Sequence, residues 1–597
     1  MTAVEARSHR MKIFVWRHGL KEILVMRNVG AVFFALLAAL TPSSVGAQLL
    51  PPQRDTLWNP GIPGGIPDRS TICAKVEAST FGNGSADARA GIQAEIARCP
   101  EGQVVQLSAG TFKISSGPIR VNKGITLRGA GPTQTVLEAP DGNNQAVVVI
   151  GVRWVKPLRS TNLTTDAVKE TYSVTVESTV GLSVGQIVLI DALTDPALTY
   201  WAADCDENCK GWFSRTDRPL TQVMEIAGIN DKTLTFTTPF HITFETSRTA
   251  QLTTFEAPAV KNAGVEDLKV FGGEGGDGGG NFFMELAAYS WLKNVESQHS
   301  IGASVHVYRS FRCVIRDSYF HETKDPNPGG AGYGIDVSLG SSDNLVENNI
   351  SWSFNKVFLM RAAGGGNVIA YNYLEDGFGA GYATMQENGL NASHMTTSHH
   401  VLFEGNEAFN LSSDGRWGNA IYITYFRNHA TTLRRDVSKL GFARDKDNRY
   451  GVWVAAHHYW YSLIGNVIGY AGMSPKPYSS FVYEDTYPFG DRHAVAMYTL
   501  GAPDSTGAPE IKTYDPKVVT TTIRDGNFDY ATNTVKWDRP AQEIPSSLYL
   551  KSKPAFFGNC AWPWIDPLGD TKIKVLPARA RFDGNPSACG EKASRAD

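Results

Sequence analysis

The sequence predicts an all-β chain that folds mainly as a parallel β-solenoid, with a short capping helix before the solenoid and a small antiparallel β subdomain inserted into it. Between Val260 and Val467 one phrase recurs, namely an apolar residue, two variable residues and then Asn or Asp. Successive phrases are separated by 22 to 38 residues. Units of this length are typical of repeat proteins that bury their apolar faces only by stacking. The phrases end at Asp267, Asn294, Asp317, Asn349, Asn372, Asn406, Asn428 and Asn466.

The shortest steps, of 22 and 23 residues, indicate the size of one coil. About 22 residues supply three strands of about 4 to 6 residues each, joined by tight turns. Stacking such coils about 4.8 Å apart pairs every strand with the next coil and satisfies the backbone hydrogen bonds. Asn and Asp suit the turns, because they tolerate left-handed backbone and can stack in an amide ladder between coils.

A short helix is expected before the first coil. Ala88, Ile92 and Ile96 recur at helical spacing after Ser85 and Asp87. Such a helix would cover the open end of the solenoid, where a sheet edge and an apolar core are otherwise exposed. The expected organisation is an N-terminal extension with a signal peptide at 1–47, an extended lead-in at 48–86, the solenoid at 87–500 and an extended C-terminal tail at 501–597 that packs on it.

The periodicity changes between about residues 171 and 254, where alternating apolar residues and turn signals favour antiparallel strands. We interpret this part as a small β subdomain inserted into the solenoid. The expected strands lie at 174–176, 186–190, 222–226, 233–237 and 251–254.

The segments at 104–112 (VVQLSAGTF) and 125–131 (ITLRGAG), with the helix at 87–99 and the later coils, resemble the pectin-lyase-like superfamily. The resemblance covers most of the chain and implies a right-handed parallel β-helix and activity on carbohydrates. The polygalacturonase strings Asn-Thr-Asp, Asp-Asp, Gly-His-Gly and Arg-Ile-Lys are absent, as is the Arg-Pro-x-x-Arg string of pectate lyases. Because fold alone does not give function, pectin is not transferred as the substrate.

Export from the cytoplasm is expected from the N-terminus. A basic start at Met26-Arg27, an apolar run at 29–40 and small residues at Val45 and Ala47 have the pattern of a signal peptide, and the run is too short to span a bilayer. Met1 and Met26 are both possible starts. We predict a secreted protein, extracellular or periplasmic, cleaved near Ala47 and not inserted in a membrane afterwards.

Charge argues against a nucleic-acid partner. Residues 1–47 hold six Lys or Arg and two Asp or Glu, so the remaining chain has a formal net charge of −7, against −3 for the whole. Nucleic-acid binding rests on a basic surface that neutralises phosphates.

All seven cysteines lie beyond the signal peptide, in a compartment expected to be oxidising. Proximity in sequence favours the pairs Cys73 with Cys99, Cys205 with Cys209, and Cys560 with Cys589. Cys313 is left over, and we expect it to be a buried free thiol. The cysteine spacing does not indicate a metal site.

Three long steps direct the search for a site. The steps 317 to 349, 372 to 406 and 428 to 466 exceed the tight coil by about ten residues or more, so their extra residues should leave as long loops that wall a groove. Loops on a rigid scaffold commonly carry catalytic groups. The second loop is the richest in acids, bases and histidines.

Our first hypothesis is a glycoside hydrolase acting on a polysaccharide. Hydrolysis uses two carboxyl groups, about 5 Å apart for retention or about 6.5 to 9.5 Å apart for inversion. Neighbouring coils, about 4.8 Å apart, can supply either spacing. Asp376 and Glu387 are the expected pair, with Asp336 or Asp414 as a third candidate.

The alternative is a polysaccharide lyase, or a uronan epimerase with the same requirements. A cation must neutralise the sugar carboxylate while a base removes the adjacent proton. Arg361 or Arg416 could do the first, and His400 or Tyr382 the second. No cofactor is expected, except that a lyase could use Ca²⁺, whose oxygen-rich spacing is not evident. The expected substrate-binding residues are Arg361, Tyr382, Arg416, Trp417 and His399.

A third interpretation is non-catalytic. Parallel β-helices also serve as adhesins and phage tailspikes, in which a groove binds a glycan. A clustered acid pair with a shifted pKa in the groove favours an enzyme, whereas an aromatic-lined groove without such a pair favours a binding protein.

Overall fold

The computed structural model divides the chain into two units, Met1–Gln48 and Leu49–Asp597, and the account below concerns the second. The residues that the structure describes are 48–202, 205, 215, 217–273, 280–324, 331–377, 389–433, 449–473, 482–485, 495–503 and 513–590. No helix among these residues is long and apolar enough to cross a membrane.

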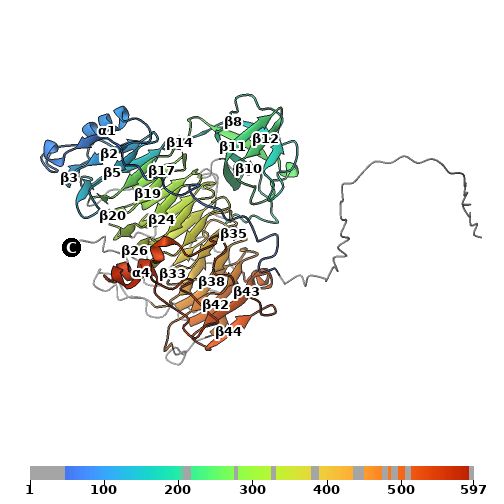
Figure 1. The fold of residues 1–597 in the computed structure, drawn as a ribbon. Coiled ribbons are helices and arrows are strands. Elements are labelled where there is room, and N and C mark those ends of the chain that lie inside the picture. The colour runs from blue at the N-terminus through green and yellow to red at the C-terminus, as the bar shows by residue number, and fades with distance from the viewer. Residues whose placement is uncertain are drawn as a thin grey trace, which may run out of the picture. The chain divides into compact units, whose positions relative to one another are not determined.

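The second unit is a right-handed parallel β-helix, as the sequence predicts. Each complete coil contributes three short strands, and each strand pairs in parallel with its counterpart in the next coil (Figure 1). One coil consists of β22 (Val314–Arg316), β23 (Tyr319–His321) and β24 (Tyr333–Ser338). In the next coil β25 (Leu345–Glu347), β26 (Ile350–Phe354) and β27 (Lys356–Arg361) pair with them in that order.

The stacked strands form three columns. One column is an 11-stranded sheet, called sheet B here. In order, sheet B contains β4 (Ile119–Val121), β7 (Val148–Gly151), β17 (Gly280–Glu285), β21 (Ala303–Tyr308), β24, β27, β30 (Leu390–Asn391), β34 (Leu411–Ser413), β38 (Arg449–Ala455), β42 (Val495–Ala502) and β41 (Val482–Asp485).

The other two columns are joined as a 23-stranded sheet, called sheet A here. Its first column contains β1 (Ile72–Val76), β2 (Val104–Leu107), β5 (Thr126–Arg128), β15 (Gly264–Glu266), β19 (Trp291–Lys293), β22, β25, β28 (Val368–Ala370), β32 (Leu402–Glu404), β36 (Thr424–Phe426), β39 (Ser462–Ile464) and β43 (Ile523–Asp529). Its second column contains β3 (Gly110–Lys113), β6 (Thr135–Glu138), β16 (Lys269–Phe271), β20 (Glu296–Gln298), β23, β26, β29 (Tyr373–Gly377), β33 (Glu407–Ala408), β37 (His429–Ala430) and β40 (Val467–Ile468). Strand β1 lies inside the predicted lead-in, so the β-helix begins earlier than its predicted start at residue 87.

The core lies inside the coils. Successive side chains of a strand point to opposite faces, so alternate residues are enclosed. In sheet B, Val305, Val307, Ile335, Val337 and Phe358 are enclosed in this way and belong to one continuous hydrophobic cluster. The residues between them face outward.

An asparagine ladder runs through the stack, as expected from the recurring phrase. Each side-chain amide donates through Nδ2 to Oδ1 of the next Asn at 2.9 to 3.1 Å. The backbone N–H of each of the first five also donates to that same Oδ1. The ladder consists of Asn349, Asn372, Asn406, Asn428, Asn466 and Asn527.

The Asn or Asp that ends the recurring phrase occupies two different positions of the coil, which the sequence analysis treated as one. Val314 pairs with Leu345, so Asp317 corresponds to Asn348 and not to Asn349. Asp317 and Asn348 both have left-handed backbone, with φ of 57° and 55°. The N–H of Ser318 donates to Oδ1 of Asn349 at 3.0 Å across a step of 31 residues, so the inferred step of 32 is wrong by one. The slip matters because one residue moves a side chain to the other face.

Helix α1 (Arg89–Arg98) forms where the sequence predicts it. Ile92 and Ile96 are fully buried and belong to the same hydrophobic cluster as the first coils. The expected disulfide joins Cys73, on β1, to Cys99 at the end of the helix.

The inserted subdomain is a six-stranded antiparallel sheet. It begins before the predicted start near residue 171, because β8 (Pro157–Asn162) is part of it. Its other strands are β9 (Ser173–Thr175), β10 (Ile187–Ala192), β11 (Leu220–Asn230), β12 (Thr233–Phe236) and β13 (Gln251–Phe255). Cys205 is disulfide-bonded, and Cys209, its expected partner, lies outside the described residues. Cys313 is free and buried, as predicted.

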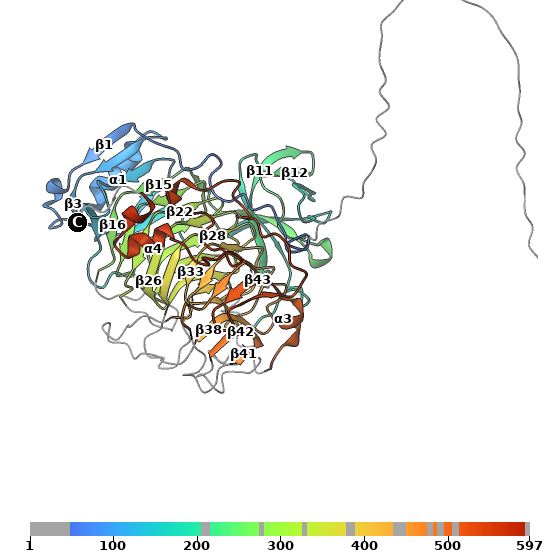
Figure 2. The same cartoon turned by 60° about the horizontal axis from the view of Figure 1, so that its bottom comes forward.

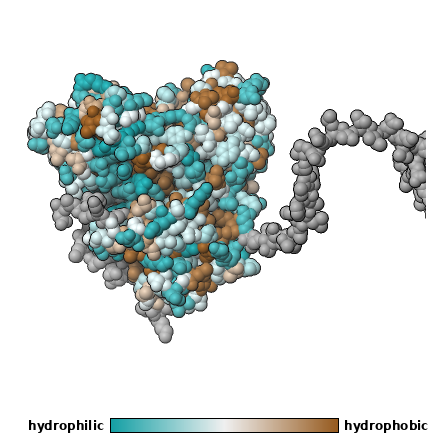
Figure 3. All heavy atoms as spheres, in the orientation of Figure 1, coloured by the Kyte–Doolittle hydropathy of each residue, from teal (hydrophilic) through white to brown (hydrophobic). Residues whose placement is uncertain are grey.

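The insert exposes apolar side chains to solvent. Figure 3 shows hydrophobic surface on this part of the molecule, at the upper right. Its largest exposed apolar side chains are Leu158, Val168, Tyr172, Val180 and Val184.

The β-helix continues beyond its predicted end at residue 500. Strand β42 crosses that boundary, α3 (Pro516–Thr521) follows, and β43 pairs with both β39 and β40. The recurring phrase was not recognised in this coil because Arg524 occupies its apolar position, which pairs with Leu463 in the preceding coil. Arg524 lies over the ring of Tyr498 at 5.2 Å and contacts Glu484 and Asp538. The antiparallel strand β44 (Thr534–Trp537) then follows.

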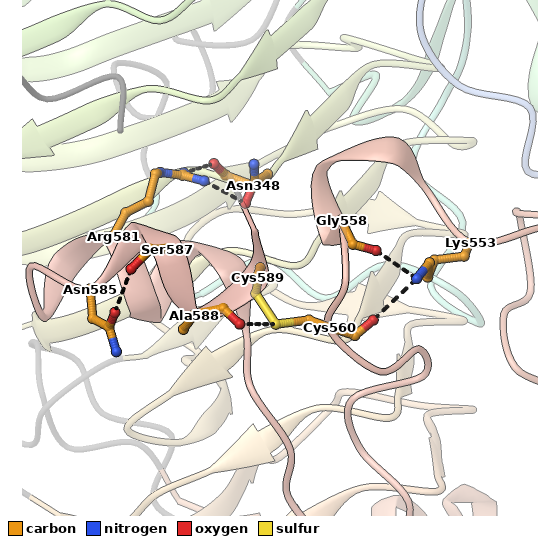
Figure 4. Close-up of a disulfide and its surroundings, with 9 residues drawn as sticks. All are labelled: Asn348, Lys553, Gly558, Cys560, Arg581, Asn585, Ser587, Ala588 and Cys589. Carbon is orange, nitrogen blue, oxygen red and sulfur yellow. Dashed lines mark hydrogen bonds between the residues drawn. A yellow bond between two sulfur atoms is a disulfide. The ribbon is translucent and has the colours of Figure 1, made fainter. Parts of the chain in front are cut away.

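The C-terminal segment returns along the outer face of sheet A, as expected of a tail packed on the helix (Figure 2). Trp564 donates through Nε1 to the carbonyl of Gly405 at 2.7 Å, and Arg579, on α4 (Pro577–Phe582), contacts Glu407 at 2.7 Å. The predicted disulfide Cys560–Cys589 closes this segment, beside Arg581 on Asn348 (Figure 4).

Candidate functional site

The long connections all lead into one sheet. The three long steps lie between β23 and β24, between β29 and β30, and between β37 and β38. Each therefore ends at the start of a strand in sheet B. The outer face of sheet B, between β17 and β34, is the candidate functional site.

This face is polar although it is largely buried. His306 pairs with Asp336 across β21 and β24, and Tyr308, Ser338 and Arg361 occupy equivalent positions on β21, β24 and β27. Asp336 and Ser338 are fully buried, whereas 19% of the Arg361 side chain and 10% of the His306 side chain are exposed. Partial exposure leaves these two side chains available to a ligand.

Asp336 is the centre of the first cluster. Its Oδ2 lies 2.9 Å from Nδ1 of His306 and accepts a hydrogen bond of 2.9 Å from the hydroxyl of Tyr308. Its Oδ1 accepts hydrogen bonds from Ser338 Oγ and, at 3.2 Å, from Arg361 Nε. The Nη2 of Arg361 donates to Oδ2 and to the Tyr308 hydroxyl. Both carboxylate oxygens are thus satisfied.

The protonation states of this cluster follow from its contacts. Burial raises the pKa of Asp336, but Arg361 and His306 outweigh that effect and hold it well below its usual value, so the carboxylate is ionised. Burial lowers the pKa of His306 despite the opposing effect of Asp336, so the imidazole is neutral. An ionised carboxylate only accepts hydrogen bonds, so Nδ1 of His306 carries the proton and Nε2 is the basic nitrogen.

Tyr308 is held as a phenol. Burial raises its pKa well above the ordinary value, and the nearby Asp336 carboxylate acts in the same direction. The cluster therefore places a neutral imidazole and a protonated phenol on β21 and a guanidinium on β27, with Asp336 on the strand between them.

Asp414 is the centre of a second cluster on the same face. It lies 2.9 Å from Nδ1 of His394, and it accepts hydrogen bonds from Asn391 Nδ2 at 2.6 Å and from the N–H of Arg416 at 3.1 Å. Burial raises its pKa, but His394 and neighbouring donors hold it well below the usual value. Arg416 lies over the ring of Trp417, 3.7 Å from its centroid.

Tyr333 lies between the two clusters. Its ring is 6.0 Å from the Arg361 guanidinium and 6.1 Å from the His394 ring, and burial raises its pKa to about 12. Asp336 and Asp414 lie on strands three steps apart in sheet B, about 14 Å at 4.8 Å per step. This separation exceeds both spacings of a hydrolase pair.

The structure brings together some of the predicted site residues. Asp336 and Arg361 share the first cluster, whereas Asp414, Arg416 and Trp417 share the second.

Other predicted residues lie elsewhere. Asp376 is buried on β29, in sheet A. His399 and His400 are fully buried at another corner of the coil, bonded to the carbonyls of Thr221 and Gln53. The structure therefore does not bring these three residues to the outer face of sheet B. Glu387 and Tyr382 lie outside the described residues.

His306 and Tyr308 were missed by the sequence analysis, which concentrated on the three long steps and the coils between them. The available signal was the strand ASVHVY at Ala303–Tyr308, in which His and Tyr alternate with the buried apolar residues Val305 and Val307. Recognising its importance requires the register of β21 on β24, which the variable connection lengths conceal.

A cation site is not evident among the residues described. They contain no group of three or more His, Cys, Asp or Glu side chains arranged to hold a metal ion.

Comparisons with known proteins were made for the whole chain. No protein family model matches it. No curated protein matches it.

Several solved structures are similar to part of the chain. The tailspike protein gp49 of Pseudomonas phage LKA1 has a TM-score of 0.46 and 14% identity over 66% of this chain and 59% of its own. The gp54 tailspike of Acinetobacter baumannii bacteriophage AP22, solved with a capsular saccharide, has a TM-score of 0.45 and 11% identity over 71% and 64%. The A-module of the Azotobacter vinelandii mannuronan C-5 epimerase AlgE6 has a TM-score of 0.29 and 11% identity over 76% and 98%. The chain thus spans about three fifths of each of these two tailspikes.

Proposed function

We propose that this protein is a polysaccharide lyase that acts on a uronate-containing glycan at the outer face of sheet B. The observation that carries the proposal is the cluster of His306, Tyr308, Asp336 and Arg361, which combines a base and an acid on β21 with a cation on β27, joined by Asp336 on β24 between them. Removal of a proton next to a sugar carboxylate needs these three kinds of group.

Arg361 would bind the sugar carboxylate. Its Nε and Nη2 are committed to Asp336, Ser338 and Tyr308, whereas Nη1 has no hydrogen bond recorded among the described residues. Neutralising the carboxylate makes the adjacent C5 proton more acidic, because negative charge develops on that group when the proton leaves.

His306 would remove the C5 proton through Nε2. Its neutral state leaves a lone pair on that nitrogen, while Asp336 stabilises the imidazolium that forms. Asp336 is therefore a positioning residue, which fixes the tautomer and orientation of the base.

Tyr308 would act as the acid. As the C5–H electron pair forms the C4=C5 double bond, the bond from C4 to the glycosidic oxygen breaks. The Tyr308 hydroxyl, which donates to Asp336 Oδ2 in the free protein, would turn from Asp336 and give its proton to that oxygen. His306 then releases its proton to solvent and Tyr308 regains one, which restores the starting state.

The hydrolase hypothesis finds less support in the described residues. A hydrolase needs one protonated carboxylic acid near a second carboxylate. On this face Asp336 and Asp414 both have lowered pKa values and lie three strands apart, whereas Glu285, whose pKa burial raises, is bound by Arg309 and by the N–H of Trp154. The predicted pair of Asp376 and Glu387 includes one residue on sheet A and one outside the described part of the chain.

Export is part of the proposal. Two disulfides and the disulfide-bonded Cys205 suit an oxidising compartment, in keeping with the signal-like segment at 1–47. Cleavage near Ala47 would release the protein outside the cytoplasm.

The test is digestion of a panel of polyuronates, namely polygalacturonate, alginate, hyaluronan and heparosan. A lyase releases products with the absorbance of an unsaturated uronate. New reducing ends without unsaturation would indicate the hydrolase instead, and altered sugar configuration without cleavage, detected by NMR, would indicate the epimerase. Binding of a polyuronate without any of these changes would indicate a glycan-binding protein.

A further inference from the structure

We propose that Arg153 and Trp154 form a second subsite, which binds an acidic sugar of the same polymer away from the reacting residue. The proposal rests on the proposed function for the identity of the polymer. Both residues lie in the connection between β7 and the insert, at the end of sheet B nearest to α1.

Trp154 presents an aromatic ring to solvent. Its exposed fraction is 65%, which is the largest among the exposed aromatic residues described. Exposed aromatic rings with a fixed orientation provide a flat apolar surface on which a sugar ring can stack. An exposed Trp with no contacts would have no fixed orientation, so the contacts that hold Trp154 in place bear on whether it can form a subsite.

The Trp154 backbone is fixed from below by Glu285. The N–H of Trp154 donates to Oε2 of Glu285 at 2.6 Å, and Arg309 binds the other carboxylate oxygen at 2.7 Å. Trp154 has a left-handed φ of 62°, which is uncommon for a bulky residue and persists only where surrounding contacts hold it. The tryptophan is thus built into a defined position.

Arg153 is stacked but lacks a fixed anionic partner. Its guanidinium lies 5.1 Å from the centroid of Trp154 and 5.0 Å from that of Phe283. Its Nε is buried and has no hydrogen-bond partner among the residues described. The two Nη groups make no hydrogen bond to the described residues, and they, not the buried Nε, are the donors that a sugar carboxylate would meet on a guanidinium held by cation–π contacts.

The surrounding charge favours an anion. The charges of Glu285 and Arg120 both act on Arg153, so its guanidinium lies near a second guanidinium as well as near one carboxylate. A sugar carboxylate bound at Arg153 would offset the repulsion between the two guanidinium groups.

The aromatic surface formed by Trp154 and Phe283 extends to the first cluster. The ring of Phe283 lies 6.0 Å from Trp154 and 5.1 Å from both His306 and Tyr308. Strand β7 is two steps from β21, the strand of His306, in sheet B, about 10 Å at about 4.8 Å per step. A polymer lying along the stack would therefore contact Trp154 and Arg153 while another of its residues reaches His306.

The test is equilibrium binding by titration calorimetry, with polygalacturonate and alginate as probes, in the full chain carrying His306→Gln to prevent turnover. Arg153→Gln is expected to weaken binding at least tenfold and to remove the preference for polygalacturonate over its methyl-esterified, uncharged form. Trp154→Ala is expected to weaken binding of both forms. Arg153→Lys keeps the charge and should retain part of the preference. Arg159→Gln, on strand β8 of the insert, is the matched control and should bind like the parent.

Affinities of Arg153→Gln and Trp154→Ala within twofold of the parent would overturn the subsite, as would a parent chain that binds neither polyuronate. If circular dichroism shows that Arg153→Gln does not fold, the affinities of Arg153→Lys and Trp154→Ala test the subsite in its place. The two proposals fail differently, because binding without any unsaturated product would remove the lyase and leave the subsite.

Discussion

The Nδ1 nitrogen of His306 lies 2.9 Å from Oδ2 of Asp336, between paired positions of the neighbouring strands β21 and β24. The pair orients a neutral imidazole on a sheet face that also carries Arg361 and Tyr308. The β-helix makes this arrangement rigid, because each of the two residues is held by the hydrogen bonds of adjacent coils.

Replacing His306 tests the assignment of the base. His306→Gln should lower kcat for release of unsaturated products by about 10²- to 10⁴-fold, because general-base catalysis contributes about that much. KM should change little, since Arg361 remains. The matched control is His321→Gln, on β23 in sheet A, where the imidazole contacts Glu296 and Glu322. Equal activity of the two variants would contradict the assignment.

The dependence of activity on pH tests the state of the same imidazole. Burial lowers the pKa of His306 below its ordinary value of 6.5. A base with a lowered pKa is deprotonated at lower pH, so kcat/KM should rise with pH, reach half its plateau below pH 6.5 and be flat near pH 7. A pH–rate profile of the wild-type protein measures this. An acid limb centred above pH 6.5 would contradict it.

Two buried histidines should make the fold sensitive to acid. Burial lowers the pKa of His399 to about 3 and that of His458 to about 4. In the unfolded chain these two histidines take up protons below about pH 6.5, whereas in the folded protein they stay neutral down to about pH 4. The free energy of unfolding therefore has its full contribution from them above pH 6.5, and this contribution is lost as the pH falls toward 4. Each histidine contributes a slope of up to about 1.4 kcal/mol per pH unit.

The variant His399→Gln should show a shallower loss of stability between pH 6.5 and pH 4.5 than the wild type, because Gln does not titrate. Urea unfolding at several pH values measures the difference in slope. Parallel pH dependences for the two proteins would show that His399 takes up its proton in the folded state as well.

The asparagine ladder should contribute strongly to stability at its centre. Asn406 accepts from the N–H and amide of Asn372 and donates to Asn428 and to the carbonyl of Ile369. Asn406→Ala leaves several buried groups unsatisfied, each at about 1 to 3 kcal/mol, so a loss of several kcal/mol is expected.

Asn527 is the comparison for this prediction, because it ends the described ladder and its side chain, within the described part of the chain, bonds to Asn466 and to the carbonyl of Leu463 alone. Asn527→Ala should therefore destabilise the protein less than Asn406→Ala. Urea unfolding monitored by tryptophan fluorescence distinguishes the two, and an equal or reversed order would mean that the ladder does not act as a connected series.

The fold was predictable because its signals are local and repeated. The apolar residues and Asn of each phrase recur in every coil, and each occurrence supports the others. Errors arose where a single residue broke the pattern. Arg524 replaced an apolar residue and concealed the last coil, and the neighbouring asparagines Asn348 and Asn349 concealed a slip of one residue.

The candidate site was predictable only in part. Asp336 was found because it lies in a long step, Asp414 because it lies in the tight coil between two long steps, and Arg361 because it stands in an apolar strand phrase. His306 and Tyr308 were not, because they lie on a regular strand with no unusual composition around it. His399 and His400 were overvalued because the density of polar residues in a loop does not reveal burial under the insert and the lead-in.

The sequence by itself determined the parallel coils, helix α1, the pairs Cys73–Cys99 and Cys560–Cys589, and the recurring asparagines, since each depends on periodicity or on proximity along the chain. Only the tertiary structure decided that His306 lies against Asp336 and that Arg153 lies on Phe283. These contacts join residues from different coils, and connections of unequal length separate those residues in the sequence. Their alignment therefore depends on the register of the stacked strands, which backbone hydrogen bonding and core packing set together.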